Sequence, residues 1–184
     1  MSNFVFTETG IEGLVVIEPK VHGDERGYFM ETWNLRDFKS AGIPMQFVQD
    51  NQSKSQKGVL RGMHYQKKNP QGKLVRVISG QVFDVAVDLR GNSPTLGKWY
   101  GISLCAEKKN MLYIPEGFAH GFLTLSDSVE FTYKCTRLYA PDDEGGLIWN
   151  DPDVGIKWPR IGMDYILSEK DKLNPTYKEI LKGW

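Results

Sequence analysis

The sequence predicts an all-β fold, because short strand-like segments separated by glycine and proline turns occupy most of the chain. Residues 81–89 show the clearest alternation, with Val85 and Val87 on one face and Asp84 and Asp88 on the other. Short strands at this spacing are typical of a β-sandwich, barrel or jelly roll. Further strands are predicted at residues 14–18, 28–33, 47–52, 99–104, 111–114, 120–125 and 129–137.

Helical signals are confined to two peripheral segments. Asn34 is the predicted N-cap of a short helix that ends at Gly42, and residues 175–181 form the second helical segment. Between them, residues 58–80 are predicted to form a hairpin of two strands that brings His64 close to Lys73. We therefore expect a β core with a few short helices around it.

Length and composition indicate one globular domain, residues 1–184, with 40% hydrophobic and 25% charged residues. Lys plus Arg equals Asp plus Glu at 23 each, so no basic face for nucleic acid is expected. No segment is apolar enough to span a membrane, and the first ten residues do not resemble a secretory signal. Cys105 and Cys135 lack a metal-type spacing and are expected to be reduced, so the expected location is cytoplasmic.

Two histidines lie in strongly apolar predicted strands, His64 and His120. Each alone is more often a core histidine than a catalyst. The segment around His120, Pro-x-Gly-x-x-His, resembles the second motif of the cupins, which fold as a double-stranded β-helix or jelly-roll barrel. Metal-binding cupins carry a His-x-His pair in their first motif, but Gln66 stands in the second position here and Lys73 is nearby. Two imidazoles beside an ammonium bind a divalent cation poorly, so we expect no metal.

A tyrosine completes a possible acid–base set. Tyr133 has the same strand parity as Phe131 and Cys135, which predicts that it points into the barrel, although a half-buried core tyrosine fits this pattern too. A histidine base and a tyrosine acid on opposite walls can remove a proton from one face of a carbon and return one to the other face. A nearby lysine can stabilise the enolate oxygen that forms. This chemistry is epimerisation next to a carbonyl group.

Several long motifs resemble the dTDP-4-dehydrorhamnose 3,5-epimerase family: DERGYFMETWN, GVLRGMHYQ, PQGKLVRVISGQVFDVAVDLR, IPEGFAHGFLTLSD, YKCTRLYAPDDEGGLIWNDPDVGIKWP and LSEKD. The similarity covers nearly the whole chain. It implies two epimerisations, at C3 and C5, beside the C4 ketone of a dTDP-4-keto-6-deoxy sugar, with no metal or cofactor. It also implies a homodimer, in which an N-terminal strand such as residues 14–18 could extend the sheet of a partner.

The same resemblance implies a role for each matching residue. His64 would be the general base, Asp171 the carboxylate that orients it, Lys73 the cation near the C4 oxygen, and Tyr133 the acid on the opposite face. Without the resemblance, Asp171 would be interpreted as a solvated charge near a helix start. Nucleotide contacts are implied at Arg26, Phe29 and Glu31, and further substrate contacts at Gln49, Asn51, Arg61, His120, Tyr139 and Lys170.

Strand geometry adds one condition. Arg61 and His64 are an odd number of residues apart, so a regular strand would point them to opposite faces. Both can line one pocket only if the strand is irregular between them, and Gly62 is the expected position of a bulge or kink.

The sequence leaves three alternatives to a 3,5-epimerase open. The chain could be a relative that epimerises only C3 or only C5 or that moves the keto group, a non-catalytic sugar-nucleotide binding module, or a metal-dependent cupin oxygenase.

Overall fold

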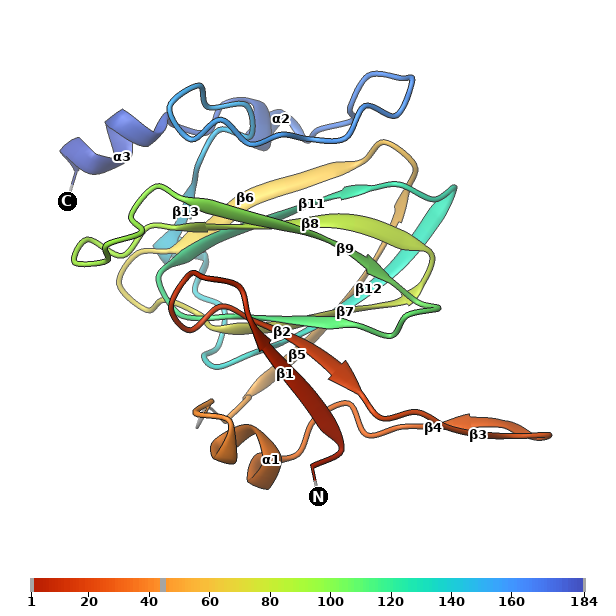
Figure 1. Cartoon of the computed structure of the whole chain (residues 1–184). Helices are drawn as coiled ribbons and strands as arrows, with labels where there is room; N and C mark the ends of the chain where they lie inside the picture. Colours follow the sequence, from red (N-terminus) through yellow and green to blue (C-terminus); the bar gives the residue numbers. More distant parts are fainter. Residues whose placement is uncertain (1, 44–45, 184) are drawn as a thin grey trace.

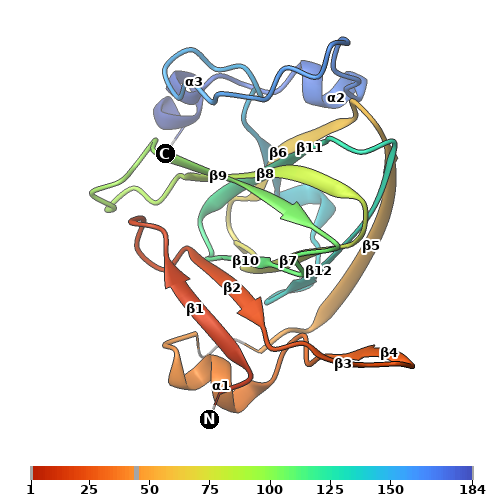
Figure 2. The same cartoon turned by 45° about the vertical axis from the view of Figure 1, so that its right-hand side comes forward.

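Most of the strands form two antiparallel sheets that face each other across a common interior (Figure 1). The computed structural model describes residues 2–43 and 46–183. One sheet has six strands in the order β1-β2-β10-β7-β12-β5, and the other has five in the order β13-β6-β11-β8-β9. A second view shows the sheets curving around the interior as a barrel (Figure 2). The predicted cupin-like jelly roll with few helices is confirmed.

Most predicted strands are present, with ends shifted by a few residues. The six-stranded sheet contains β1 (Phe4–Glu8), β2 (Val15–Pro19), β5 (Gln49–Gln56), β7 (Lys73–Ser79), β10 (Met111–Ile114) and β12 (Ser128–Cys135). The five-stranded sheet contains β6 (Leu60–Gln66), β8 (Gln81–Asp88), β9 (Trp99–Cys105), β11 (Phe118–Thr124) and β13 (Glu144–Gly146).

The predicted hairpin over residues 58–80 is wrong. β6 hydrogen-bonds to β11 and β13, whereas β7 hydrogen-bonds to β10 and β12 in the other sheet. The six residues 67–72 cross between the sheets, and an extended chain of that length reaches roughly 20 Å, about twice the usual ~10 Å separation of packed sheets. Strands that follow each other in sequence therefore form opposite walls of the barrel.

The barrel interior is apolar over most of its length. Inward-facing side chains from both sheets pack there, among them Val75, Ala86, Phe122 and Phe131, and Phe122 stacks on Phe131 with ring centroids 4.4 Å apart. Along β8 the predicted alternation is present, but both faces are buried, because Val85 and Val87 pack outward under the C-terminal segment. Asp84 and Asp88 consequently lie on the inner face and are fully buried.

Short helices cover the outer faces of the two sheets. α1 (Leu35–Ser40) packs Phe38 against the six-stranded sheet, and Asn34 caps it as predicted by accepting a hydrogen bond from the Asp37 amide. The C-terminal segment lies over the five-stranded sheet with α2 (Glu169–Lys172) and α3 (Tyr177–Lys182) (Figure 1). Sequence patterns missed α2 and the single 3-10 turn η1 (Pro141–Asp143), because each is too short to show helical periodicity.

The predicted strand at residues 28–33 is mostly absent. Only β4 (Gly27–Phe29) is extended, and it pairs with β3 (His22–Asp24) in a small hairpin that projects from the barrel (Figure 1). The aromatic residues that suggested a core strand are exposed instead, Tyr28 by 62% and Phe29 by 69%. β2 lies between β1 and β10 and is hydrogen-bonded on both sides, so the expectation that residues 14–18 extend a partner's sheet is also wrong.

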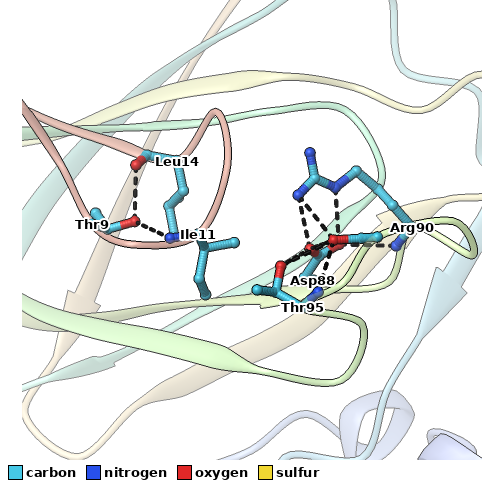
Figure 3. Close-up of polar contacts among 7 residues, drawn as sticks. Thr9, Ile11, Leu14, Asp88, Arg90 and Thr95 are labelled. Carbon is cyan, nitrogen blue, oxygen red and sulfur yellow. Dashed lines mark hydrogen bonds and ion pairs between the residues drawn. The ribbon is translucent and has the colours of Figure 1, made fainter.

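Polar side chains hold the loops at one end of the barrel (Figure 3). Thr9 accepts a hydrogen bond from the Ile11 amide and donates one to the Leu14 carbonyl, which shapes the turn between β1 and β2. In the loop after β8, several side chains hydrogen-bond to Asp88. Its carboxylate accepts hydrogen bonds from Arg90, at 2.9 and 2.8 Å, and from the hydroxyl groups of Ser93 and Thr95.

Candidate active site

A cavity of about 230 Å³ opens between the two sheets. Six of the residues predicted from the sequence line it, with four additional residues. The predicted ones are Gln49, Asn51, His64, Lys73, Tyr133 and Tyr139, and the others are Tyr65, Gln66, Gln71 and Glu144.

A larger hollow of about 380 Å³ lies beside this cavity and shares Asn51 and Tyr133 with it. Its other lining residues include Leu74, Arg76 and Lys134, whose strand parity is opposite to that of Lys73 and Tyr133. It therefore lies largely on the outer face of the six-stranded sheet. His64 and Lys73 line only the smaller cavity, which makes the smaller cavity the candidate active site.

His64 forms a hydrogen-bonded pair with Asp171. The distance from Nε2 of His64 to Oδ1 of Asp171 is 2.6 Å, and the other carboxylate oxygen accepts a hydrogen bond of 3.3 Å from the Gly62 amide. Asp171 lies in α2, whose N-cap Ser168 accepts a hydrogen bond from the Asp171 amide. This short helix carries Asp171 to a buried position behind the imidazole, although sequence patterns place it among solvated charges.

The environment of Asp171 keeps it ionised. Burial acts to raise its pKa, but the hydrogen bond and charge of His64, with the Gly62 amide, outweigh burial and hold the pKa below its ordinary value. A carboxylate that remains ionised fixes the orientation of the imidazole and stabilises its protonated form. With Nε2 engaged, Nδ1 of His64 is the nitrogen left to accept a proton.

Tyr133 and Lys73 reach the cavity from the sheet opposite His64. Both are on the inner face of the six-stranded sheet, on β12 and β7, whereas His64 is on β6 of the other sheet. Burial raises the pKa of Tyr133, so its hydroxyl is protonated at neutral pH and can donate a proton. Within residues 2–43 and 46–183, the Lys73 ammonium has no hydrogen-bond or ion-pair partner, which leaves it available to a ligand.

Glu144 is a cavity residue that sequence reasoning missed. It accepts a hydrogen bond of 2.8 Å from the Tyr139 hydroxyl and also binds the Lys170 ammonium. It thereby joins two of the predicted substrate contacts at the rim of the cavity. β13, which carries Glu144, has three residues, and so short a strand leaves no periodic signal in the sequence.

Gln49 and Asn51 are held in place on β5. Gln49 accepts a hydrogen bond of 2.8 Å from the Tyr139 amide and donates one of 3.1 Å to Asn51. Asn51 in turn directs its amide group toward the sulfur of Cys135, at 3.6 Å. Two polar groups of β5 therefore face the cavity in defined orientations.

His120 lies deeper in the barrel and does not line the cavity. Its Nε2 is 2.9 Å from Oδ2 of Asp84, and its ring stacks on Phe131. It is the cross-strand neighbour of His64, so the two histidines belong to adjacent strands and face the same interior. Asp84 is a second residue missed from the sequence, because the local alternation does not show that the face with Asp84 and Asp88 is buried.

The remaining predicted contacts lie outside the cavity. Arg61 is exposed and donates a hydrogen bond of 2.9 Å to the Ser55 hydroxyl. Its positive charge acts on Tyr133 and lowers the pKa of that hydroxyl, although burial raises this pKa by more. Arg26 and Phe29 lie in the projecting β3–β4 hairpin, where Arg26 pairs with Asp24. Glu31 hydrogen-bonds to Asn34 at the start of α1. A single chain does not bring these three residues to the cavity.

The strand irregularity expected at Gly62 is confirmed. The register between β6 and β11 shifts by one residue between the pairs His64–His120 and Arg61–Phe122. Gly62 has φ of 122°, a conformation that favours glycine, and the Gly62–Met63 peptide bond is cis.

Residues 2–43 and 46–183 contain neither a membrane-spanning helix nor a metal-binding cluster of side chains. No helix there is long and apolar enough to cross a membrane. No group of three or more His, Cys, Asp or Glu side chains in that part of the chain is arranged to hold a metal ion.

Comparison with known proteins identifies the family. Residues 8–179 match the family model described as dTDP-4-dehydrorhamnose 3,5-epimerase. This chain belongs to the dTDP-4-dehydrorhamnose 3,5-epimerase family. It is therefore an isomerase, as predicted. A family member from Methanothermobacter thermautotrophicus is 56% identical, over 96% of this chain and 100% of that protein.

Solved structures of epimerases have the same fold. The dTDP-6-deoxy-D-glucose-3,5-epimerase from Legionella pneumophila, in complex with dTDP-4-keto-L-rhamnose, is 48% identical over 96% of this chain and 94% of that one, with a TM-score of 0.93. A 3'-monoepimerase from Streptomyces bikiniensis, in complex with dTDP-quinovose, is 35% identical over 94% of this chain and 89% of that one, with a TM-score of 0.86.

Proposed function

We propose that this protein converts dTDP-4-dehydro-6-deoxy-D-glucose to dTDP-4-dehydro-L-rhamnose by inverting C3 and C5 through proton transfers among its own side chains. The observation that carries the proposal is the arrangement of His64 and Tyr133 on opposite sheets of one cavity, with Lys73 on the same sheet as Tyr133. Inversion at carbon requires a base on one face and an acid on the other. A binding module has no need of such an arrangement.

Each inversion proceeds through an enolate. Nδ1 of His64 removes the proton from the carbon next to the C4 ketone, and the electron pair moves to the ketone oxygen. Lys73 donates a hydrogen bond to that oxygen and stabilises its negative charge. The Tyr133 hydroxyl then returns a proton to the opposite face of the carbon as the ketone re-forms. Exchange with solvent restores both side chains before the second carbon reacts.

Asp171 supports the base without touching the substrate. Its carboxylate holds Nε2 of His64 and thereby directs Nδ1 into the cavity. The ionised carboxylate also stabilises the imidazolium that forms in each step. The remaining cavity residues, together with His120, Arg61 and Lys170, are proposed to orient the sugar and the diphosphate.

The hairpin residues Arg26 and Phe29, with Glu31 beside them, are proposed to act in a homodimer. They match nucleotide-contacting positions of the family, yet within one chain they lie outside the cavity. A second copy whose hairpin reaches this cavity would supply them. The exposed rings of Tyr28 and Phe29 suit such a contact, because a base or an apolar surface would cover them.

Inversion of one carbon alone is the second candidate function, because a 3'-monoepimerase is among the structures that share this fold. The same base, acid and cation would serve it. The two candidates differ in the number of carbons that exchange a proton.

The test is proton NMR of dTDP-4-dehydro-6-deoxy-D-glucose incubated with the protein in deuterated water. Deuterium is expected at both C3 and C5, and at only one of these carbons if the protein is a monoepimerase. His64→Ala should reduce turnover about 1,000-fold, because general-base catalysis contributes roughly 10²–10⁴ in rate. Binding of dTDP, measured by calorimetry, should persist in this variant. No exchange at either carbon by wild-type protein that binds dTDP would reduce the function to binding.

A further inference from the structure

The bulge in β6 changes which side chains face the barrel interior. Two residues of β6, Gly62 and Met63, lie opposite the single residue Gly121 of β11. Cross-strand partners point to the same face of a sheet, and His120 and Phe122 share the inner face because they are two residues apart. Their partners, His64 and Arg61, consequently both face inward, which a regular strand would forbid.

The bulge depends on a close approach of two backbones. A Cβ atom at Gly121 would lie 2.7 Å from the Arg61 carbonyl oxygen and 2.6 Å from the Met63 sulfur. A Cβ atom at Gly62 would lie 2.6 Å from the Gly121 Cα. Side chains at these positions would force β6 and β11 apart, so the strands contact each other here only because both residues are glycine.

The bulge also frees a backbone donor. The Met63 amide and carbonyl pair with Leu147, on the side of β6 away from β11. The Gly62 amide donates instead to Oδ2 of Asp171, the carboxylate whose other oxygen binds His64. Asp171 is almost fully buried, so this amide satisfies an oxygen that water cannot reach. The backbone of the bulge thus orients the partner of the proposed base.

We propose that Gly121 is a positioning residue for the proposed epimerisation: by lacking a side chain, it allows the Gly62–Met63 bulge that holds Asp171 against His64 and puts Arg61 on the same face of the strand as His64. Gly121 touches no substrate and acts only through β6. The expected effect of Gly121 on kcat rests on the proposed function. Its structural consequence, the integrity of the His64–Asp171 hydrogen bond, can be measured without turnover.

The test variant is Gly121→Ala. Its kcat is expected to fall about 100-fold with little change in KM, because a displacement of about 1 Å in a catalytic group costs rate on that scale. The ring N–H signal of the His64–Asp171 hydrogen bond in proton NMR should weaken or disappear. That signal is assigned in the wild type by its loss in Asp171→Asn.

Gly101→Ala is the matched control. Gly101 lies on β9 in the same sheet, and an added Cβ atom would lie 2.3 Å from the Phe83 ring, away from the bulge. It should lower the melting temperature comparably and leave kcat and the hydrogen-bonded proton unchanged. Equal losses of kcat in both variants would overturn the proposal, because the effect would then be general destabilisation.

A second variant keeps the proposal testable if Gly121→Ala folds poorly. Met63→Ala combined with Gly121→Ala removes the contact with the sulfur and retains the contact with the Arg61 carbonyl. Measured against Met63→Ala alone, the double variant should keep the loss of kcat and of the NMR signal. Recovery of both would overturn the proposal. If the wild type shows no proton exchange, the proposed function fails, while the NMR signal still decides whether Gly121 positions the pair.

Discussion

Lys73 carries a charge at a position that disfavours it. Burial lowers the pKa of its ammonium group, and the nearby acidic groups of Cys135, Asp84 and Glu144 only partly oppose this. A lysine with a lowered pKa loses its proton at a lower pH than a lysine in water. The proposed enolate would then lose its stabilising cation at a lower pH than it would beside an ordinary lysine.

We therefore expect kcat to fall with rising pH at a value below the ordinary lysine pKa of 10.5. Lys73→Arg should move this decline to higher pH, because a guanidinium keeps its proton there. Rates of deuterium incorporation measured across the alkaline range check this expectation. Lys67→Ala, at an exposed lysine of the adjoining loop, is the control and should keep the wild-type profile. A Lys73→Arg profile that coincides with the wild type would contradict it.

At the scale of single residues, sequence reasoning found the groups with distinctive chemistry. His64, Lys73 and Tyr133 were selected by residue type, strand parity and family resemblance, and all three line one cavity. Glu144 and Asp84 were missed because an acidic residue in a short or alternating strand looks like any solvated carboxylate. Only the packed structure shows that Glu144 hydrogen-bonds to Tyr139 and that Asp84 is buried against His120.

At the scale of elements, the loop after β8 depends on one carboxylate. Asp88 is fully buried, and although burial raises its pKa, hydrogen bonds from Arg90, Ser93 and Thr95 outweigh this and lower the pKa from 3.8 to about 2. A carboxyl group whose pKa is lowered in the folded state stabilises that state above about pH 4. This stabilisation is lost as the pH falls from about 4 to about 2.

The ionised Asp88 carboxylate contributes roughly 2 kcal/mol to the free energy of unfolding, because one pKa unit corresponds to about 1.4 kcal/mol. Asp88→Asn should lower the free energy of unfolding at pH 7 by about that amount and flatten its decline below pH 4. Urea denaturation at a series of pH values measures both effects. Asp142→Asn, at an exposed carboxylate in the η1 turn, is the control. An unchanged acid slope in Asp88→Asn would refute this assignment.

Elements were easier to predict than their pairing. Strand positions follow from local alternation, and most were found within a few residues. The pairing of β6 with β11 and of β7 with β12 was not predicted, because hydrogen-bond partners far apart in sequence leave no local pattern. The proximity of His64 and Lys73 was expected for the wrong reason: they face each other across the barrel and are not neighbours in a hairpin.

At the scale of the whole molecule, the proposed homodimer makes a prediction about mixed chains. If the β3–β4 hairpin of one chain completes the cavity of the other, a His64→Ala chain and an Arg26→Ala/Phe29→Ala chain should each be nearly inactive. A purified heterodimer of the two should regain about half the wild-type activity, because one of its two cavities has both an intact base and an intact hairpin.

Differently tagged chains, co-expressed and separated by two affinity steps, provide the heterodimer. Its activity is compared with each homodimer at the same protein concentration. A monomeric protein in light scattering, or a heterodimer as inactive as its parents, would show that the hairpin does not serve a neighbouring cavity.

The sequence by itself determined the fold class, the positions of most strands and the identity of the residues with acid–base chemistry. These features follow from local alternation, turn residues and residue type, all of which act over a few positions. Only the tertiary structure decided which sheet each strand joins, that Asp171 is almost fully buried, and that the hairpin with Arg26 and Phe29 lies away from the cavity. The pairing of Asp171 with His64 was implied by the family resemblance and by no local pattern. These depend on packing between distant segments, where the free energy comes from burial and pairing across the whole barrel.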